Sequence, residues 1–460
     1  MIQFSKKDNE KILKAIKEGK IDSADISFPN LIDTILLKMK ELGLLGKLPK
    51  AFKDKRMKNI SIPLDNILSL SIAAKMKLKT SLTDIPFAVT DGELLSELGW
   101  NLWDTDRKIE DGLLEEGVIR NIVTKYEAQE FIESYNNYVQ NIVMPELNIT
   151  PQIHILDCTK IKVNLSNRNY ENSEVIHDDG ELIRGYKLAT LRGLLDDSGI
   201  IEEIAFGSIK PHDLELSKEL LLNSKVLREG DVIINDRGFI SRNIINNLKN
   251  DKKVDTYIPA KKNMTIYEQA VMIAKSEGKW HTHPNKKRKT QEIQLVKELG
   301  SFWLSENIKE DVDISACVVH DTKDDEYYVF MTTDTTKTAK QIITTYELRP
   351  EIEEDYRQIK DFWKLEDFKS TKYNYIAFHI VMVLIGYMYF QLYKNLDEGR
   401  KFSKKSLPVI LKNYKEEKPK SVIIYAGQNF GIFSFLEFIQ LYAGCDEKVR
   451  KLLEPTLALV

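Results

Sequence analysis

The chain has 460 residues, 42% of them hydrophobic and 30% charged, and its 67 Lys and Arg residues nearly balance its 70 Asp and Glu residues, for a net charge of −3. These values are typical of a globular protein of roughly two to four domains and exclude a uniformly basic nucleic-acid binder, so any DNA affinity has to come from local basic patches. Three widely separated cysteines, Cys158, Cys317 and Cys445, exclude a zinc finger or a disulfide framework, and an N-terminus without an apolar signal segment favours the cytoplasm.

The first part of the chain, residues 1–148, is predicted to be helical. Apolar residues recur at helical spacing after Asn30, which can cap a helix that ends at Gly43, and again over residues 63–77. Between these helices, residues 47–58 carry six cations and one anion. Such a segment is either a patch that contacts a DNA backbone or a solvated charged loop.

Near residue 151 the pattern changes to alternating strands and helices. We expect strands at residues 153–163, 186–195, 200–206, 231–235 and 254–259, with helices at 213–222 and 240–248. Strand-like runs and the basic run 286–289 then fill residues 260–335, which we interpret as an inserted, mostly β subdomain. The rest of the chain is predicted to be helical. This succession indicates an α/β domain.

One later segment, residues 376–393, is almost entirely apolar and has 18 residues, the short limit for a membrane-spanning helix. His379, Gly386 and Gln391 interrupt it. Because nothing else in the sequence suggests a bilayer, we predict a buried core helix rather than a membrane span.

Two aspartates stand in or directly after apolar strands. Asp157 follows His-Ile-Leu, and Asp236 follows Val-Ile-Ile-Asn. A carboxylate there is costly to bury unless it is paired or bound to a metal. Carboxylates that converge in the fold can share two divalent cations, as in polymerases and nucleases. Taken alone, each aspartate is more simply a turn residue.

Four residues follow at the spacing Y-(2)-R-(3)-E-(6)-K: Tyr346, Arg349, Glu353 and Lys360. Residues seven apart lie on nearly one helix face, offset by about 20°, so Glu353 and Lys360 should point the same way. Glu353 would complete a metal site with the two aspartates, and the two cations would hold phosphates. Pro350 either begins this helix, leaving Tyr346 and Arg349 outside it, or kinks it.

The alternative for this run is a solvated amphipathic helix held by pairs of opposite charge. Glu351, Glu354 and Asp355 are assigned to such a solvated helix face. Cys158 is predicted to be packed, and His281 and His283 are interpreted as incidental rather than as metal ligands. His154 could face either the site or the solvent.

Together these features resemble the DDE transposases of bacterial insertion sequences, in the group marked by the Y-R-E-K signature. The resemblance covers roughly residues 150–395 and is carried by Asp157-Cys-Thr, Gly185-Tyr-Lys-Leu, Lys210-Pro-His-Asp, Asp236-Arg-Gly-Phe and the full Y-R-E-K spacing. Pro350 departs from the pattern, since many members have tryptophan there.

The resemblance implies roles for six residues. Asp157, Asp236 and Glu353 look like the catalytic triad that binds Mg²⁺, for which Mn²⁺ could substitute. A second set looks like the contacts to the DNA end: Tyr346, Arg349 and Lys360.

It also implies a ribonuclease H-like catalytic core with an inserted, mostly β subdomain, preceded by a helical N-terminal region and followed by C-terminal helices. The expected domains are a DNA-binding region at 1–148, the first part of the core at 149–259, the insertion at 260–335, completion of the core with the Y-R-E-K helix at 336–395, and a helical C-terminal region at 396–460.

The implied function is a DNA transposase that cuts and joins DNA at terminal inverted repeats by two-metal phosphoryl transfer. Its partners would be double-stranded DNA, as inverted repeats and as target, and a second protomer in a synaptic complex. One alternative is a transposase-derived DNA-binding protein that no longer cuts, although all three acids and both cations are present. Another is a metal-dependent nuclease without a strand-transfer step.

Overall fold

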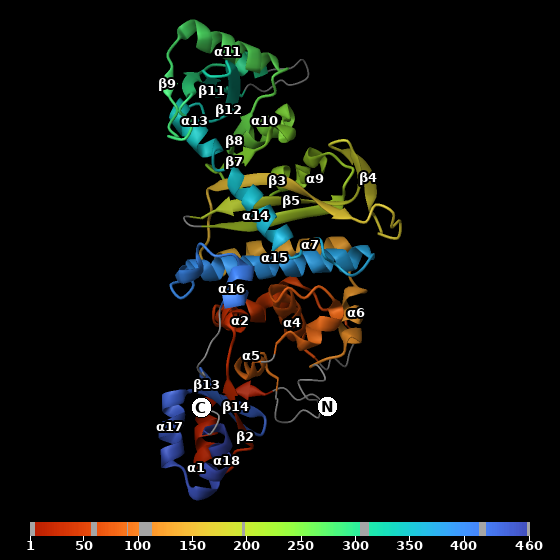
Figure 1. Cartoon of the computed structure of the whole chain (residues 1–460), viewed down its shortest axis with the longest axis vertical. Coiled ribbons are helices and arrows are strands. Elements are labelled where there is room, and N and C mark those ends of the chain that lie inside the picture. The colour runs from red at the N-terminus through yellow and green to blue at the C-terminus, as the bar shows by residue number, and fades with distance from the viewer. Residues whose placement is uncertain are drawn as a thin grey trace. The chain divides into compact units, whose positions relative to one another are not determined.

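A computed structural model describes residues 5–56, 62–89, 91–100, 113–195, 198–303, 312–413 and 420–457 (Figure 1). The chain divides into two compact units. The terminal unit consists of Met1–Ser134 and Ile359–Val460, and the central unit of Tyr135–Gln358. The residues that follow 358 therefore group with the N-terminal helices, whereas the sequence placed them with the catalytic core up to residue 395.

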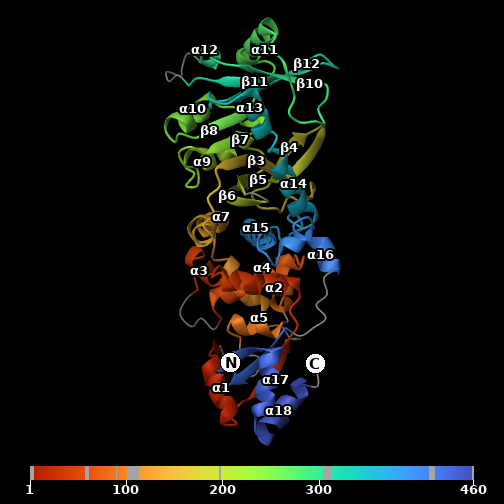
Figure 2. The same ribbon diagram turned by 90° about the vertical axis from the view of Figure 1, so that its left-hand side faces the viewer.

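A ten-stranded sheet forms the middle of the central unit (Figures 1 and 2). Its strands are β3 (Ile153–Val163), β4 (Glu174–Asp178), β5 (Glu181–Leu194), β6 (Gly199–Ser208), β7 (Val232–Asn235), β8 (Asp255–Pro259), β9 (His281–Thr282), β10 (Gln291–Val296), β11 (Ser315–Asp321) and β12 (Glu326–Thr332). The order is β4-β5-β3-β7-β8-β12-β11-β10-β9, and β6 also pairs with β5. β3, β7 and β8 run parallel, and the other pairings are antiparallel.

The long strand β5 organises one side of this sheet. β6 pairs with its residues 186–194 and β4 with its residues 181–185, so two strands share one edge of β5. A bulge in β6 at Glu202, opposite Leu191 and Arg192, shifts the register. Bulges change the direction of side chains. Next to this bulge, Glu202 is buried on one face of the sheet, and Arg192 is buried on the other face, where it contacts a helix.

Residues 260–335, the predicted insertion, are rich in strands, and these strands join the ten-stranded sheet. β12 pairs with β8 through Phe330↔Pro259 and Thr332↔Tyr257, and β11, β10 and β9 follow in order. The insertion therefore extends the same sheet. The physical reason is that β8 would otherwise present an open edge of unpaired backbone groups, which β12 satisfies.

Helices cover both faces of this sheet. They are α8 (Met144–Glu146), α9 (Asp213–Leu222), α10 (Arg242–Asn250), α11 (Thr265–Glu277), α12 (Gly300–Trp303), α13 (Ala339–Tyr346) and α14 (Pro350–Asp361), of which α14 continues into the terminal unit. α9 contacts Cys158 of β3, whereas α14 contacts Asp157, the next residue along. Because successive strand residues point to opposite faces, α9 and α14 lie on opposite sides of the sheet.

The core beneath α13 and α14 runs through both the first strands and the insertion. It contains Ile155, Ile234, Tyr257, Ile293, Cys317, Val319, Ala339, Ile342, Ile343, Ile352 and Tyr356. One continuous apolar face thus fixes the two helices that carry the Y-R-E-K residues.

The terminal unit contains most of the remaining helices. They are α1 (Asn9–Lys17), α2 (Leu31–Glu41), α3 (Leu48–Ala51), α4 (Leu64–Met76), α5 (Gly92–Glu97), α6 (Glu116–Val123), α7 (Ala128–Tyr138, which continues into the central unit), α15 (Tyr373–Asn395), α16 (Leu407–Asn413), α17 (Phe435–Gly444) and α18 (Glu447–Leu457). The predicted cap of α2 is confirmed, because the Asn30 side chain accepts the N–H of Asp33.

The expectation of purely helical ends is wrong. β1 (Lys6–Lys7), β2 (Ser23–Ser27), β13 (Ser421–Ala426) and β14 (Asn429–Ser434) form a four-stranded sheet in the order β1-β14-β13-β2. β2 pairs with β13 through Ser27↔Ser421, nearly 400 residues apart in the chain. Each strand is short and depends on a distant partner, which local periodicity does not reveal.

The apolar segment at residues 376–393 forms most of α15. This helix is long and apolar enough to span a membrane by length and composition, and 94% of its most apolar window is buried. It packs against α4 and α2 within the terminal unit. The prediction of a core helix is therefore confirmed.

Candidate active site

Two of the predicted acids are brought together by neighbouring parallel strands. β3 and β7 pair in register at Leu156↔Asn235, so Asp157 and Asp236 each follow a paired residue. β7 ends at Asn235, and Asp236 precedes a short turn of helix at Arg237–Phe239. The Asp157 side chain is 14% exposed and that of Asp236 is 40% exposed. The two carboxylates thus stand side by side, one buried and one open to the solvent.

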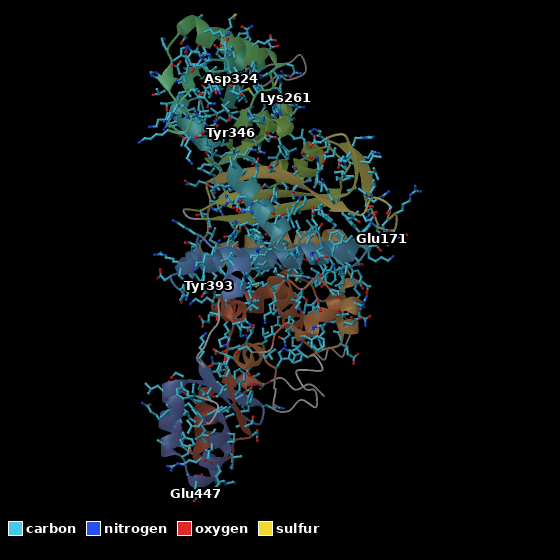
Figure 3. All side chains as sticks on the ribbon, in the orientation of Figure 1. Glu171, Lys261, Asp324, Tyr346, Tyr393 and Glu447 are labelled. Atoms are coloured by element: carbon cyan, nitrogen blue, oxygen red, sulfur yellow. The ribbon has the colours of Figure 1, made fainter. Side chains whose placement is uncertain are left out.

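Glu353 arrives from the helix pair on the same face of the sheet. α13 ends at Tyr346, and α14 begins at Pro350, so Arg349 lies in the connecting turn (Figure 3, where Tyr346 is labelled). Proline fits the first helical position, because its missing N–H has no partner there in any helix. Of the two possibilities for Pro350, the first is confirmed: the proline begins the helix, with Tyr346 and Arg349 outside it.

The Arg349 guanidinium lies in the middle of the three carboxylates. Its Nη1 is 2.5 Å from Glu353 Oε1, and its Nη2 is 3.1 Å from Asp157 Oδ2 and 4.0 Å from Asp236 Oδ2. These residues come from three separate parts of the chain: β3, the end of β7, and the segment that contains both Arg349 and Glu353. The structure therefore gathers the three predicted acids and one predicted cation into a single cluster, which we call the carboxylate triad and its arginine.

The electrostatics of the triad favour binding of further positive charge. Burial raises the pKa of Asp157 to about 6, Arg349 and the Cys158 N–H at 2.8 Å lower it, and the neighbouring carboxylates Asp236 and Glu353 raise it. One guanidinium does not neutralise three carboxylates, and hard divalent cations prefer carboxylate oxygen. The donor set therefore fits such a cation. In this conformation, however, the described residues include no group of three or more His, Cys, Asp or Glu side chains placed to hold a metal.

Tyr346 lies next to the triad. Its ring packs on Phe330 of β12, with centroids 4.7 Å apart. Burial raises the pKa of Tyr346 to about 12, Arg349 lowers it, and the three carboxylates raise it. The phenol is therefore neutral near pH 7 and keeps its O–H as a hydrogen-bond donor.

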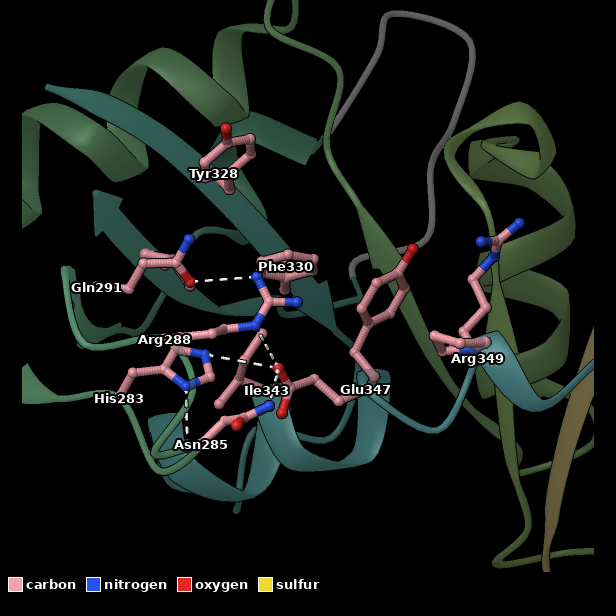
Figure 4. A pocket seen from close by; sticks show the side chains of 12 residues that line it. His283, Asn285, Arg288, Gln291, Tyr328, Phe330, Ile343, Glu347 and Arg349 are labelled. Carbon is pink, nitrogen blue, oxygen red and sulfur yellow. Dashed lines mark hydrogen bonds and ion pairs between the residues drawn. The ribbon is translucent and has the colours of Figure 1, made fainter. Parts of the chain in front are cut away.

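A cavity of about 590 Å³ opens beside Tyr346, between α13 and the insertion strands (Figure 4). Its lining consists of His283, Asn285, Arg288, Gln291, Val319, Tyr328, Phe330, Ile343, Tyr346, Glu347, Arg349 and Pro350. Inside it, Arg288 Nε is 2.8 Å from Glu347 Oε1. Figure 4 shows the Arg349 side chain extending away from this pair.

The two histidines of the insertion lie in different environments. His281 is exposed on β9, while His283 is buried in the cavity and accepts the Asn285 N–H at Nδ1, 3.1 Å away. His283 Nε2 is 3.9 Å from Glu347 Oε1. His283 thus contributes to a cavity that the sequence did not reveal, whereas His281 does not.

The sequence did not identify three residues that hold α14 in position: Thr190, Arg192 and Tyr356. The Tyr356 hydroxyl donates to the Asp157 carbonyl oxygen at 2.7 Å and lies 2.7 Å from Thr190 Oγ1. Arg192 of β5 is ion-paired with Asp355 through Nε and bonds Glu351 through Nη1 at 3.0 Å. These contacts fasten α14 to β3 and β5.

The assignment of Asp355 to a solvated helix face is therefore wrong, whereas the Glu351 side chain is 47% exposed, as assigned. The side chain of Asp355 is only 12% exposed and Arg192 is 5% exposed, so the ion pair is buried. Glu354 is solvated as expected, because it pairs with Arg357 at 2.6 Å, with both side chains about half exposed. The signal that could have identified Tyr356 is its position three residues after Glu353, on the same side of the helix.

His154 faces neither the triad nor the solvent. It is buried on the other face of β3, with Nδ1 2.7 Å from Glu202 and Nε2 3.2 Å from Asp231. Cys158 is packed as expected: its Sγ lies 3.4 Å from Ser217 Oγ, and burial raises its pKa to about 12.

Lys360 lies in the last turn of α14, which runs without interruption from Pro350 to Asp361. The helix therefore keeps Glu353 and Lys360 seven residues apart along one continuous element, as the spacing predicted. Lys360 Nζ is 3.3 Å from Glu366. Lys360 belongs to the terminal unit, and Glu353 to the central unit.

The two basic segments are partly paired. In residues 47–58, Lys55 is ion-paired with Glu130, and Arg56 is 2.7 Å from Asp54, while Met57 and Lys58 lie outside the described residues. In residues 286–289, Arg288 is bound to Glu347, while its neighbours on both sides are exposed. Neither segment is a purely solvated loop.

The comparisons with known proteins give one finding. Residues 149–389 match the model of a protein family described as "Transposase DDE domain". This span is more than half of the 460 residues and contains the triad, its arginine and α14. No curated protein gave a match.

Proposed function

This chain belongs to the family of transposase DDE domains, and from that premise we propose that it is a DNA transposase that cuts and joins DNA at the terminal inverted repeats of an insertion sequence. The observation that carries the proposal is the meeting of Asp157, Asp236 and Glu353 around Arg349. The Y-R-E-K spacing supports membership of the group with that signature. The strand order β6-β5-β3-β7-β8, with only the last three parallel, supports a ribonuclease H-like core.

We assign the three carboxylates to the binding of Mg²⁺, with Mn²⁺ as a substitute. When bound, such cations lower the pKa of an attacking water or hydroxyl and stabilise charge on the leaving oxygen. The excess of negative charge in the cluster and its all-oxygen donor set support this assignment. Glu353 is 56% exposed and Asp236 40% exposed, so both carboxylates are open to an approaching DNA strand.

The remaining site residues bind and orient the DNA end. Arg349 is suited to a phosphate, because its planar guanidinium can donate two parallel hydrogen bonds. The neutral phenol of Tyr346 can donate one more, and Lys360 supplies a point charge further along α14. Tyr356 holds Glu353 in place through the Asp157 backbone.

The partners that follow are double-stranded DNA, as inverted repeats and as target, and a second protomer in the synaptic complex. Residues 1–148 are proposed to bind the inverted repeats, and the protein is proposed to act in the cytoplasm. Contacts to the DNA backbone predict binding that weakens steeply with salt.

The proposal is tested by strand cleavage on duplex DNA taken from both flanks of the gene, with and without Mg²⁺. The intact chain runs beside Glu353→Gln and the matched control Glu354→Gln, whose side chain is exposed and paired only with residues of its own helix. The expected result is a Mg²⁺-dependent nick at an inverted-repeat boundary, lost in Glu353→Gln and kept in Glu354→Gln.

Two other results would point elsewhere. Salt-sensitive binding to the same ends without any nick would favour the DNA-binding derivative. A nick that survives Glu353→Gln would contradict the assignment of the third acid.

A further inference from the structure

The position of Arg349 raises a question that its role as a phosphate ligand does not answer. Its guanidinium stands between Asp157, Asp236 and Glu353, where a cation shared by the three carboxylates would have to be. The described part of the chain holds no ready group of three metal-binding side chains. A guanidinium and a divalent cation cannot both fill the centre of one small carboxylate cluster.

We propose that Arg349 is an internal counter-cation, which occupies the centre of the triad in the absence of metal and has to move out before a divalent cation binds there. This inference rests on the proposed function and adds a step to it. Before a divalent cation binds, the guanidinium charge stabilises the three neighbouring carboxylates. After the side chain has moved out, the same charge binds a phosphate. Metal loading is then an exchange of one cation for another rather than the filling of a preformed cage.

The contacts of Arg349 are those of a side chain that is bound to the triad but can dissociate from it. Nη1 and Nη2 are bonded to carboxylates, yet the 4.0 Å separation from Asp236 is at the limit of an ion pair. The third nitrogen, Nε, is buried and has no hydrogen-bond partner among the described residues. An unsatisfied buried donor weakens the arrangement.

The position of Arg349 in the chain also allows movement. The residue lies in the turn between α13 and α14, so its side chain can rotate without disturbing either helix. It borders the cavity of about 590 Å³ beside Tyr346, which offers space next to the triad. That cavity contains Glu347, a carboxylate outside the triad.

The test measures Mn²⁺ binding to the full chain without DNA, by electron paramagnetic resonance of free Mn²⁺ at one pH and one salt concentration. Arg349→Gln is compared with the intact chain. The matched control is Arg288→Gln, which removes an equal charge from another residue that lines the cavity but is paired with Glu347 rather than with the triad. Asp157→Asn identifies the binding that belongs to the triad.

The expected result is that Arg349→Gln binds Mn²⁺ at least about tenfold more tightly than the intact chain, because a competing charge within hydrogen-bonding distance of the ligands is gone. Arg288→Gln should stay within about twofold of the intact chain, because the charge that it removes is already paired with Glu347. If Arg349→Gln does not fold, Arg349→Lys replaces it. A single ammonium cannot span the three carboxylates, so this variant should also bind more tightly than the intact chain.

Equal or weaker Mn²⁺ binding by the folded Arg349 variant would overturn the inference and leave the proposed function standing. Equal gains in Arg349→Gln and Arg288→Gln would also overturn it, since the effect would then be one of net charge alone. If neither the intact chain nor Arg349→Gln bound Mn²⁺ in a manner that depends on Asp157, the metal-binding triad of the proposed function would fail as well.

Discussion

The buried ion pair between Arg192 and Asp355 should matter more to this protein than any ion pair on its surface. The perturbation is Arg192→Met, which keeps the volume of the side chain and removes its charge. Arg192 is 5% exposed and Asp355 12% exposed, so the buried carboxylate loses its guanidinium partner. Breaking a buried pair in this way costs about 3–5 kcal/mol.

The size of the effect can be converted to a melting temperature. The central unit has 224 residues, from 135 to 358. For domains of this size, 1 kcal/mol shifts Tm by about 2–4 °C, so Arg192→Met should lower Tm by about 6–20 °C. The matched control is Arg357→Met. Arg357 lies on α14, as Asp355 does, and its ion pair with Glu354 joins side chains that are 51% and 47% exposed. Exposed pairs contribute about 0.2–1 kcal/mol, so this control should lose at most about 4 °C.

The assay is thermal unfolding of the full chain, followed by circular dichroism, for both variants. Adding Asp355→Leu to Arg192→Met should recover part of the lost stability, because the buried carboxylate that lost its guanidinium partner is then removed as well. Equal Tm losses in Arg192→Met and Arg357→Met would contradict this prediction, because burial would then not determine the free-energy cost of breaking an ion pair.

Three further predictions follow from neighbouring contacts. Tyr356→Phe should lower the free energy of unfolding in urea by about 1–3 kcal/mol, because the Asp157 carbonyl and Thr190 both lose a buried hydroxyl partner. The same variant should lower kcat for nicking more than it raises KM. Unchanged stability and kcat would contradict this. Burial lowers the pKa of His154, but its two carboxylate partners outweigh burial and raise it to about 9 from 6.5. Stabilisation by the charged ring should therefore be complete below pH 6.5 and lost as the pH rises toward 9, and His154→Gln should flatten this fall in Tm; an equal slope in the variant would count against it. Gly199→Ala should destabilise the chain about as much as Arg192→Met, because a Cβ there would stand 2.2 Å from the Arg192 guanidinium carbon, and a neutral result in the same unfolding assay would show that the arginine can shift.

Much of the central unit could be predicted from the sequence, because its elements are set by local signals. The strand at residues 153–163 and the helix at 213–222 lie where apolar periodicity placed them. Pro350 limited the sequence to two possibilities, a helix that begins there or a kinked helix, and α14 begins there. Asp157 and Asp236 were singled out by their positions in or after apolar strands, and Arg349 and Glu353 by their spacing; the structure brings the four side chains together.

The features that were missed depend on contacts between distant parts of the chain. The sheet that joins β2 to β13 has no local signal, because its strands are stable only as a pair. The sequence predicted strands in the inserted residues 260–335, but it could not show that β12 pairs with β8 and so joins these strands to the main sheet. Asp355 was assigned to a solvated face because its partner, Arg192, lies 163 residues earlier in the chain.

The contact of Arg349 with all three carboxylates was also beyond the sequence. Its spacing four residues before Glu353 predicts one ion pair along a helix. The other two contacts arise because the turn between α13 and α14 brings it next to β3 and β7.

The measurement that tests the central claim most directly is strand transfer. A pre-nicked inverted-repeat end with a free 3′-hydroxyl is mixed with target DNA, Mg²⁺ and the full chain, beside Glu353→Gln and Glu354→Gln. We expect joined products with the intact chain and Glu354→Gln and none with Glu353→Gln. An intact chain that nicks uncut ends but joins no pre-nicked end to the target would contradict the proposed transposase and indicate a nuclease.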